Sequence, residues 1–253
     1  MSGNFEELFG PVVGKGLQAT VYARGDYAVK LYREGYDKTH VFEEALIMAR
    51  LEEMDFPGPK VYEVLLADGQ YGLRMDRVRG SLMNEGLNDP ERRLETMKTL
   101  VGLQLDLQKH SAPWALDFRQ RLQKSLEDNK VLAPDLREQL LAEIRDLPDG
   151  QTMCHCDFHG GNVFFDGEKH MIIDLLQISA GDPAADAACS YVSYSFAHKG
   201  TADLYLDIYC EQSGIPKERV ARWLRVYAGA LTGEVPETHR PLLEKYIMGE
   251  EGL

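Results

Sequence analysis

The sequence predicts an α+β protein with two lobes: a small N-terminal lobe built on an antiparallel β-sheet with one helix, and a larger C-terminal lobe that is mainly helical. Short β-branched and aromatic runs separated by glycine turns fill the first third of the chain, whereas amphipathic helical patterns prevail after Gly80. With 253 residues, of which 44 % are hydrophobic and 27 % charged, the chain can bury a sizeable core. We place the lobe boundary within 76–80, which assigns residues 1–78 to the N-terminal lobe and 79–253 to the C-terminal lobe.

Five strands and one helix are predicted in the N-terminal lobe. The strands lie in FGPVVGKG, ATVYARG, DYAVKLYR, PKVYEVLLAD and QYGLRMDRV, and the sequences ARGDYAV and LADGQYG predict tight hairpin turns. A helix is predicted over about residues 38–54, with Phe42, Ala45, Leu46 and Ala49 at helical spacing on its buried face. The sequence FPGP ends this helix, because proline cannot continue it.

The C-terminal lobe is predicted to hold one pair of strands among several helices. The strands VFF and MII are separated by the turn DGEK, and the next helix begins in GDPAADAACSYV. In that segment Asp182 can cap the first helical turn and Pro183 fits into it. The other helices are expected at about residues 90–110, 115–129, 134–147, 200–213, 216–231 and 238–248.

The charge and the hydropathy of the chain restrict its partners. The formal net charge of −13 argues against nucleic-acid binding, because no basic patch is available to replace the counterions of phosphates. The same charge permits attraction of cationic small molecules to an acidic cleft, although acidity can also serve solubility alone. No apolar run is long enough to cross a membrane. The segment MSGNFEELFG lacks the basic and apolar regions of a secretory signal, so we expect a cytoplasmic location.

A candidate phosphate-binding hairpin lies near the N-terminus. Gly14 and Gly16 stand between two predicted strands and are followed by Ala19 and Val21. Small residues in such a hairpin let backbone N–H groups approach phosphates closely. Glycines of this kind also occur in ordinary turns, so the hairpin alone does not decide the function.

Lys30 is a second candidate for phosphate binding. Strand alternation places it on the same face as Ala28, within an apolar strand. A buried ammonium group needs compensation, which phosphates and a carboxylate would supply; otherwise Lys30 lies on an exposed edge. Glu43 and Glu44 of the following helix are both candidates for that carboxylate, and helix periodicity does not separate them.

The segment HCDFHGGNVFFDGEKHMIID carries the third group of candidates. Asp157 and Asn162 precede VFF, and Asp174 follows MII, so pairing of the two strands brings these side chains to one end of a hairpin. Carboxylate and amide oxygens suit Mg²⁺, and an acidic group without a metal can act as a base. The alternative is a set of turn-forming residues. The spacing Asp-x4-Asn, strand pair, Asp favours a phosphotransferase loop.

These segments together resemble one family. HCDFHGGN and IID look like the H-x-D-x4-N and I-x-D motifs of the aminoglycoside phosphotransferase and choline kinase family, relatives of the protein kinases. GDPAADAA is similar to the family's G-D-P-x-x-D-x-A segment, and GKGLQATVY, AVKLY, EEALIMARLEEMDFPGPKVYEV and RMDRVRG follow the family's order. The resemblance covers about residues 10–190 and implies a bilobal protein-kinase-like fold. No motif is matched beyond residue 190, where the family builds much of its acceptor pocket.

The resemblance implies a role for each matching position. Asp157 resembles the catalytic base that accepts the proton of the acceptor hydroxyl, and Asn162 and Asp174 resemble the Mg²⁺ ligands. Lys30 resembles the lysine that holds the α- and β-phosphates. Glu44 resembles its ion-pair partner, preferred over its neighbour because EAL and the distance to FPGP fit the family register.

Further positions are implied to contact the nucleotide, ATP or GTP. Residues 14–21 would cover the phosphates, and the backbone from Asp76 to Val78 would meet the base. The residues assigned to the nucleotide site are Gly14, Gly16, Val21, Ala28, Lys30, Glu44, Asp76, Val78 and Ile173.

A few residues around the loop either support it or depart from the family pattern. His155, Asp182 and Asp186 would support the loop structurally. Cys156 stands where the family usually has glycine, and Leu175 where it usually has an aromatic residue. These departures remove no catalytic group.

The implied activity is transfer of the γ-phosphoryl group to a hydroxyl of a small, cationic molecule, such as an aminoglycoside, choline or an amino alcohol. Asp203, Asp207 and Glu211 share a helical face that could hold ammonium groups or be merely solvated. One alternative is a catalytically silent nucleotide-binding pseudokinase, although the base, the ligands and the lysine are all present. A protein Ser/Thr kinase is the other, although the chain lacks an APE-type segment and only seven residues separate Asp174 from Asp182.

Overall fold

A computed structural model describes residues 5–197 and 199–250. The described residues form two compact units: residues 5–83 with 161–176, and residues 84–160 with 177–250. Segment 161–176, which contains Asn162 and Asp174, therefore belongs with the N-terminal residues, whereas Asp157 belongs to the second unit. The lobe boundary at residues 78 and 79 stays a prediction.

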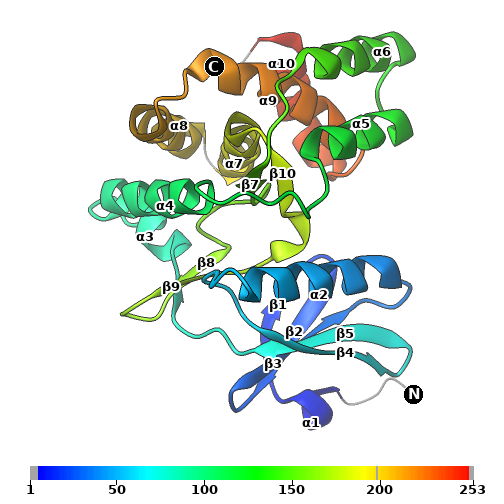
Figure 1. The fold of residues 1–253 in the computed structure, drawn as a ribbon, viewed down its shortest axis with the longest axis vertical. Helices are drawn as coiled ribbons and strands as arrows, with labels where there is room; N and C mark the ends of the chain where they lie inside the picture. Colours follow the sequence, from blue (N-terminus) through cyan, green and yellow to red (C-terminus); the bar gives the residue numbers. More distant parts are fainter. Residues whose placement is uncertain (1–4, 198, 251–253) are drawn as a thin grey trace. The chain divides into compact units, whose positions relative to one another are not determined.

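The first unit is built on a five-stranded antiparallel sheet (Figure 1) with the strand order β1-β2-β3-β5-β4. The two predicted hairpin turns are present. Gly25 lies in the first turn, between β2 and β3, with a φ of 62°, and Asp68 and Gly69 lie in the second, between β4 and β5, with φ values of 46° and 79°. All five predicted strands are present. Their bounds are Val12–Lys15 (β1), Ala19–Arg24 (β2), Tyr27–Tyr32 (β3), Val61–Ala67 (β4) and Gln70–Asp76 (β5).

Helix α2 (Lys38–Glu52) packs against β4 and β5 and starts at Asp37, whose side chain accepts a hydrogen bond from the Thr39 N–H. The predicted buried face of this helix is wrong, since Phe42 is 54 % exposed and Leu46 60 %. A prediction from hydrophobicity alone chooses the wrong face of α2, because the face that packs against the sheet includes Glu44, which is ion-paired. The buried residues are Val41, Glu44, Met48 and Leu51.

Three shorter elements and one further helix complete the first unit. β6 (Ser81–Leu82), β8 (Val163–Phe165) and β9 (His170–Ile172) form a small sheet in the order β6-β8-β9. The predicted pairing of VFF with MII is thus confirmed. The carboxylate of Asp166 closes their turn by accepting the N–H groups of Glu168 and Lys169, each at 2.9 Å. Helix α1 (Phe5–Phe9), not predicted, contacts Tyr22 through its aromatic rings.

The second unit is mainly helical, as predicted, and its core surrounds α7, which packs against α8 and α9 (Figure 1). The short strands β7 (Thr152–Cys154) and β10 (Ser179–Gly181) pair beside α7. Among the described helices, none is both long and apolar enough to cross a membrane. The helices are α3 (Asn84–Asn88), α4 (Arg93–Leu107), α5 (Phe118–Asp128), α6 (Pro134–Glu143), α7 (Pro183–Ala197), α8 (Lys199–Ser213), α9 (Lys217–Leu231) and α10 (Arg240–Met248), with 3-10 turns η1 (Ile144–Asp146), η2 (Leu175–Gln177) and η3 (Glu237–His239).

Candidate active site

Lys30 on β3 lies between two carboxylates. Its Nζ is 2.8 Å from Oε1 and 3.0 Å from Oε2 of Glu44, and 3.1 Å from Oδ1 of Asp174. The Lys30 side chain is 14 % exposed and that of Glu44 3 %. The predicted lysine thus has an ion-pair partner on α2, and that partner is Glu44, not Glu43.

The surrounding charges decide the protonation of Lys30. Burial alone would lower its pKa, but the negative charges and hydrogen bonds of Glu44 and Asp174 outweigh burial and raise the pKa above 10.5. Lys30 is therefore a cation at neutral pH. A buried cation of this kind is suited to binding anionic groups.

Tyr32 is a third member of this cluster. It is fully buried, and its hydroxyl donates a hydrogen bond to Oε2 of Glu44. Burial and the charge of Glu44 raise the pKa of Tyr32, so the hydroxyl stays protonated. Sequence reasoning missed this role, although Tyr32 lies two residues after Lys30 on the same strand face, which is the signal that points to it.

The hairpin between β1 and β2 carries the two candidate glycines. Gly14 pairs with Val21, and Val21 pairs in turn with Lys30 across the sheet. Neither Gly14 nor Gly16 has a left-handed φ, and a Cβ on either would make only ordinary contacts, at 3.7 Å or more. The packing of the chain itself does not require glycine at these two positions.

Asp76 ends β5, and its polar groups are engaged within the first unit. Its N–H donates to the carbonyl of Lys60 at 2.9 Å, and its carboxylate accepts the Lys60 N–H at 3.1 Å and the Tyr62 hydroxyl at 2.6 Å. The hydrogen bond to Asp76 raises the pKa of Tyr62 to about 12. Of the other positions assigned to the nucleotide, Ala28 is buried and Val78 is half-buried.

Asn162 and Asp174 lie at the open end of the β8–β9 hairpin, as predicted. Val163 pairs with Ile172, and the Ile173 N–H donates to the Asn162 carbonyl at 2.9 Å, which brings the two ends of the hairpin together. Asp174 has a left-handed φ of 60°, a conformation that aspartate tolerates better than most residues. Its carboxylate contacts Lys30, as described above.

The oxygen donors at this hairpin end suit a hard divalent cation. Mg²⁺ is usually held by one or two carboxylates together with water and substrate phosphates, so a large cage of protein ligands is not needed. Across the part of the chain that the structure describes, no group of three His, Cys, Asp or Glu side chains forms a metal site by itself. The pair Asn162 and Asp174 fits Mg²⁺ shared with a nucleotide.

Asp157 belongs to the second unit and is partly exposed. The Ser193 hydroxyl of α7 donates to its Oδ1 at 3.3 Å, and Nε2 of His159 lies 3.5 Å from the same oxygen. Sequence reasoning assigned no role to either residue. His159 belongs to the motif HCDFHGGN, but Ser193 lies beyond every matched motif, and only the packing of α7 reveals it.

The backbone before Asp157 is held by a buried aspartate. Cys156 has a φ of 63°, and its N–H donates to Oδ1 of Asp186 at 2.7 Å. The Asp186 carboxylate also accepts the side-chain amides of Gln104 and Gln108, each at 2.8 Å. The left-handed backbone explains why glycine would be favoured at position 156, and Asp186 supports the loop as expected.

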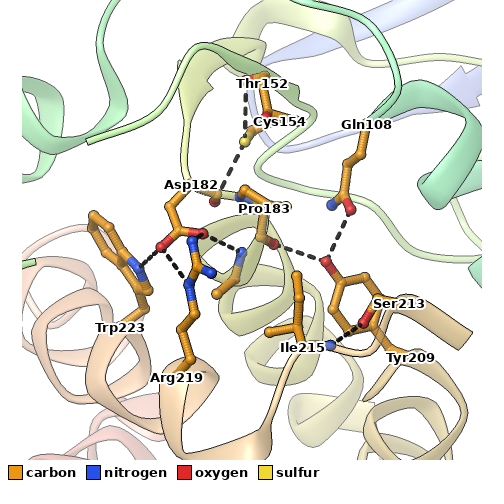
Figure 2. A network of polar contacts seen from close by, with 11 residues as sticks. Gln108, Thr152, Cys154, Asp182, Pro183, Tyr209, Ser213, Ile215, Arg219 and Trp223 are labelled. Carbon is orange, nitrogen blue, oxygen red and sulfur yellow. Dashed lines mark hydrogen bonds and ion pairs between the residues drawn. The ribbon is translucent and has the colours of Figure 1, made fainter. Parts of the chain in front are cut away.

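Asp182 joins the start of α7 to helix α9. Its buried carboxylate accepts hydrogen bonds from Arg219 at 2.8 and 3.1 Å and from Nε1 of Trp223 at 3.0 Å. Figure 2 shows these contacts as dashed lines. The carboxylate also accepts the N–H of Ala184 at 3.0 Å and so caps α7. The Asp182 carbonyl faces the thiol of Cys154 at 3.6 Å. Asp182 is thus structural, as expected.

The acidic face of α8 is partly engaged within the chain. Asp203 accepts the Tyr191 hydroxyl at 3.0 Å, and Asp207 forms an ion pair with Lys217. Both aspartates are exposed, whereas Tyr191 and Tyr194 lie in the core. This face is therefore solvent-exposed, and two of its aspartates contact nearby side chains of the same chain.

A model of the phosphotransferase enzyme family matches residues 11–240 of the chain. No curated protein matches its sequence. Solved structures that are similar in fold include a choline kinase and two aminoglycoside phosphotransferases. Choline kinase LicA from Streptococcus pneumoniae is 15 % identical, with 93 % of this chain and 90 % of that chain covered and a TM-score of 0.67. Aminoglycoside phosphotransferase APH(3'')-Id from Streptomyces rimosus is 18 % identical, with 84 % and 89 % covered and a TM-score of 0.59.

The third structure is the ADP-bound aminoglycoside phosphotransferase APH(2'')-Ib, which is 17 % identical, with 94 % of this chain and 90 % of that chain covered and a TM-score of 0.60. At these identities the similarity concerns the fold. It confirms the predicted fold class, in which an antiparallel N-terminal sheet is combined with a helical C-terminal part.

Proposed function

Because the chain belongs to the phosphotransferase enzyme family, we propose that it transfers the γ-phosphoryl group of a nucleoside triphosphate to a hydroxyl of a small molecule. The observation that carries the proposal is the cluster around Lys30. A lysine in an apolar strand is kept charged by Glu44 and also reaches Asp174, at the end of the hairpin that bears Asn162. Catalysis of phosphoryl transfer is mostly positioning and charge stabilisation, which such a cluster can supply.

Lys30 binds the α- and β-phosphates in this proposal, and Glu44 holds its ammonium group in place. The glycine hairpin covers the phosphates, which accounts for Gly14 and Gly16 where the packing does not require them. Val21, Ala28 and the segment 76–78 with Ile173 surround the base. The ADP bound to the similar APH(2'')-Ib supports an adenine nucleotide, with GTP as the alternative.

Asn162 and Asp174 hold Mg²⁺ in this proposal. The ion neutralises charge on the phosphate oxygens when it is bound. Asp157 orients the attacking hydroxyl and accepts its proton. Its Oδ1 accepts a hydrogen bond from the Ser193 hydroxyl, a contact of the kind that an acceptor alcohol would make.

A small, cationic acceptor agrees best with the chain. The formal net charge of −13 favours cationic partners, and the fold is shared with a choline kinase and with aminoglycoside phosphotransferases. The seven residues between Asp174 and Asp182 leave little room for the peptide platform of a protein Ser/Thr kinase. A silent pseudokinase is disfavoured, because the lysine, the base and both ligands are present.

A panel assay tests this proposal. The protein is incubated with Mg²⁺ and ATP or GTP, against choline, amino alcohols, sugars and aminoglycosides, and nucleoside diphosphate release is followed. Stimulation by one small alcohol is expected, and Asp157→Ala should lower that turnover roughly 10²–10⁴-fold while nucleotide binding survives. Nucleotide binding without turnover on any acceptor would favour the silent module, and phosphorylation of proteins alone would favour a protein kinase.

A further inference from the structure

We propose that Gln18 and Tyr36 are positioning residues for the nucleotide phosphates, forming a strut that holds the tip of the β1–β2 hairpin to the Lys30–Glu44 pair. The inference rests on the proposed function, since it concerns the same nucleotide site. From the sequence, Gln18 was expected only as part of segment 14–21, which would cover the phosphates, and Tyr36 was assigned no role. Both residues lie in the first unit, as do all residues used below.

The hairpin tip has few contacts of its own. Gly16 donates its N–H to the Ala19 carbonyl at 2.9 Å, which closes the turn. Leu17 at the tip is 88 % exposed, so its side chain contributes little to holding the loop. A loop whose backbone N–H groups bind phosphates works best when its position is fixed before binding.

Two hydrogen bonds supply this fixation through Gln18. Its carbonyl accepts the Arg33 N–H at 2.8 Å, and its side-chain Oε1 accepts the Tyr36 hydroxyl at 3.1 Å. Tyr36 is brought back to this position by a turn after β3, in which Gly35 has a left-handed φ of 73° and the Tyr36 N–H donates to the Arg33 carbonyl at 3.1 Å. The side-chain bond is the one that depends on the identity of both residues.

The ring of Tyr36 extends the strut to the buried ion pair. It stacks on Tyr32, with ring centroids 4.7 Å apart and an interplanar angle of 15°, and it also contacts His40. Tyr32 in turn donates its hydroxyl to Glu44, which binds Lys30. A continuous chain of contacts therefore links the hairpin tip to the lysine that the proposed function places on the phosphates.

The hydroxyl of Tyr36 remains a donor at neutral pH. Burial, followed by the negative charge of Glu44, raises the pKa of Tyr36 above its usual value. The bond to Gln18 is therefore expected to persist across the pH range in which nucleotide binding is measured.

Binding of the fluorescent nucleotide mant-ADP with Mg²⁺ tests the proposal. Tyr36→Phe removes only the hydroxyl, and Gln18→Met removes the acceptor amide at similar length. Each is expected to raise the Kd roughly threefold to tenfold, the range for one neutral hydrogen bond, mainly through faster dissociation. The double variant should bind no more weakly than the weaker single variant, because both changes break the same bond.

Hydrogen exchange of the nucleotide-free protein supplies the second readout. Amides of residues 14–19 should exchange faster in Tyr36→Phe than in the wild type, with the rest of the unit unchanged. The matched control is Tyr71→Phe, a tyrosine on β5 whose ring contacts Phe42, and it should alter neither readout.

The outcomes separate the strut from the proposed function. Unchanged exchange and unchanged Kd in Tyr36→Phe would overturn the inference, as would faster exchange spread over the whole unit with a lower Tm, which marks a purely structural role. If the wild type fails to bind mant-ADP, the proposed function fails and the positioning role with it. In that case, the rate of amide hydrogen exchange at residues 14–19 shows only whether the bond between Gln18 and Tyr36 fixes the position of the hairpin.

Discussion

Cys156 occupies a backbone conformation that favours glycine, directly before the candidate base Asp157. A left-handed φ costs a residue with a Cβ about 1–2 kcal/mol, whereas glycine adopts it freely. We therefore expect Cys156→Gly to be more stable than Cys156→Ala by about 1 kcal/mol, after allowing for the larger entropy that glycine loses on folding. Urea unfolding of the two variants measures the difference.

Cys154 provides the matched control for this prediction. It is also buried and lies two residues earlier, in strand β7, without a left-handed φ. The order should be reversed there, with Cys154→Ala more stable than Cys154→Gly. If alanine is the better replacement at both positions, the backbone of Cys156 does not carry the strain that its φ indicates.

Lys30 gives the free energy of unfolding a defined pH dependence. Its pKa is raised in the folded state, so the ion pair with Glu44 contributes stability that is fully present below pH 10.5 and is lost as the pH rises through the folded pKa. Lys30→Met should therefore lower the free energy of unfolding by about 3 kcal/mol, and by the same amount at pH 8 and pH 9.5. Above pH 10.5 the difference from the wild type should shrink. A difference that already shrinks between pH 8 and 9.5 would mean that the pKa is lowered.

At the scale of elements, α9 is tied to the start of α7 by the cluster of Figure 2. Asp182 is buried, and Arg219 compensates its charge. Arg219→Gln should therefore lower the free energy of unfolding by about 1–3 kcal/mol, since a buried carboxylate loses its cation while Trp223 and the α7 cap remain. Lys217→Gln on the same helix, which breaks an exposed pair with Asp207, should have a smaller effect. Equal effects in urea unfolding would show that Asp182 does not depend on Arg219.

The elements also show what the sequence can predict. Long elements with clear boundaries were predicted, because turns such as Gly25 and Asp68–Gly69 punctuate the strands. Five helices and strands of two to five residues were missed, namely α1, α3, β6, β7 and β10, because so short a pattern shows little periodicity. Strands β8 and β9 are equally short, but the turn DGEK between them marks their positions. The face of α2 was mispredicted because counting apolar residues gives no weight to Glu44, which is buried through its ion pair.

Residues of the candidate site could be predicted from the sequence only where they belong to a recognisable sequence motif. Lys30, Asn162 and Asp174 stand in local patterns that indicate their surroundings. Tyr32 and Ser193 acquire their contacts through tertiary packing, Tyr32 with a glutamate 12 residues later and Ser193 with a residue 36 positions earlier. Pairings of that separation depend on how helices dock, which a single sequence does not encode in its local pattern.

At the scale of the whole molecule, Mg²⁺ and nucleotide should stabilise the fold together. A ligand that binds only the folded state at 100 times its Kd adds about 2.7 kcal/mol, which raises the Tm of a chain of this size by roughly 5–10 °C. The shift with ADP and Mg²⁺ should disappear when EDTA is added, because the proposed ligands Asn162 and Asp174 would then have no cation to share with the phosphates. Differential scanning fluorimetry measures each shift against the same variant without nucleotide.

Two variants make this whole-molecule test specific. Asp174→Asn keeps the shape of the side chain but weakens cation binding, so most of the shift should be lost even with Mg²⁺ present. Asp157→Ala should keep the shift, because the proposed base acts on the acceptor and not on the nucleotide. A full shift in Asp174→Asn would mean that Asp174 does not bind the cation. An equal loss of the shift in both variants would mean that Asp174 and Asp157 do not have the separate roles proposed for them, at the metal and at the acceptor.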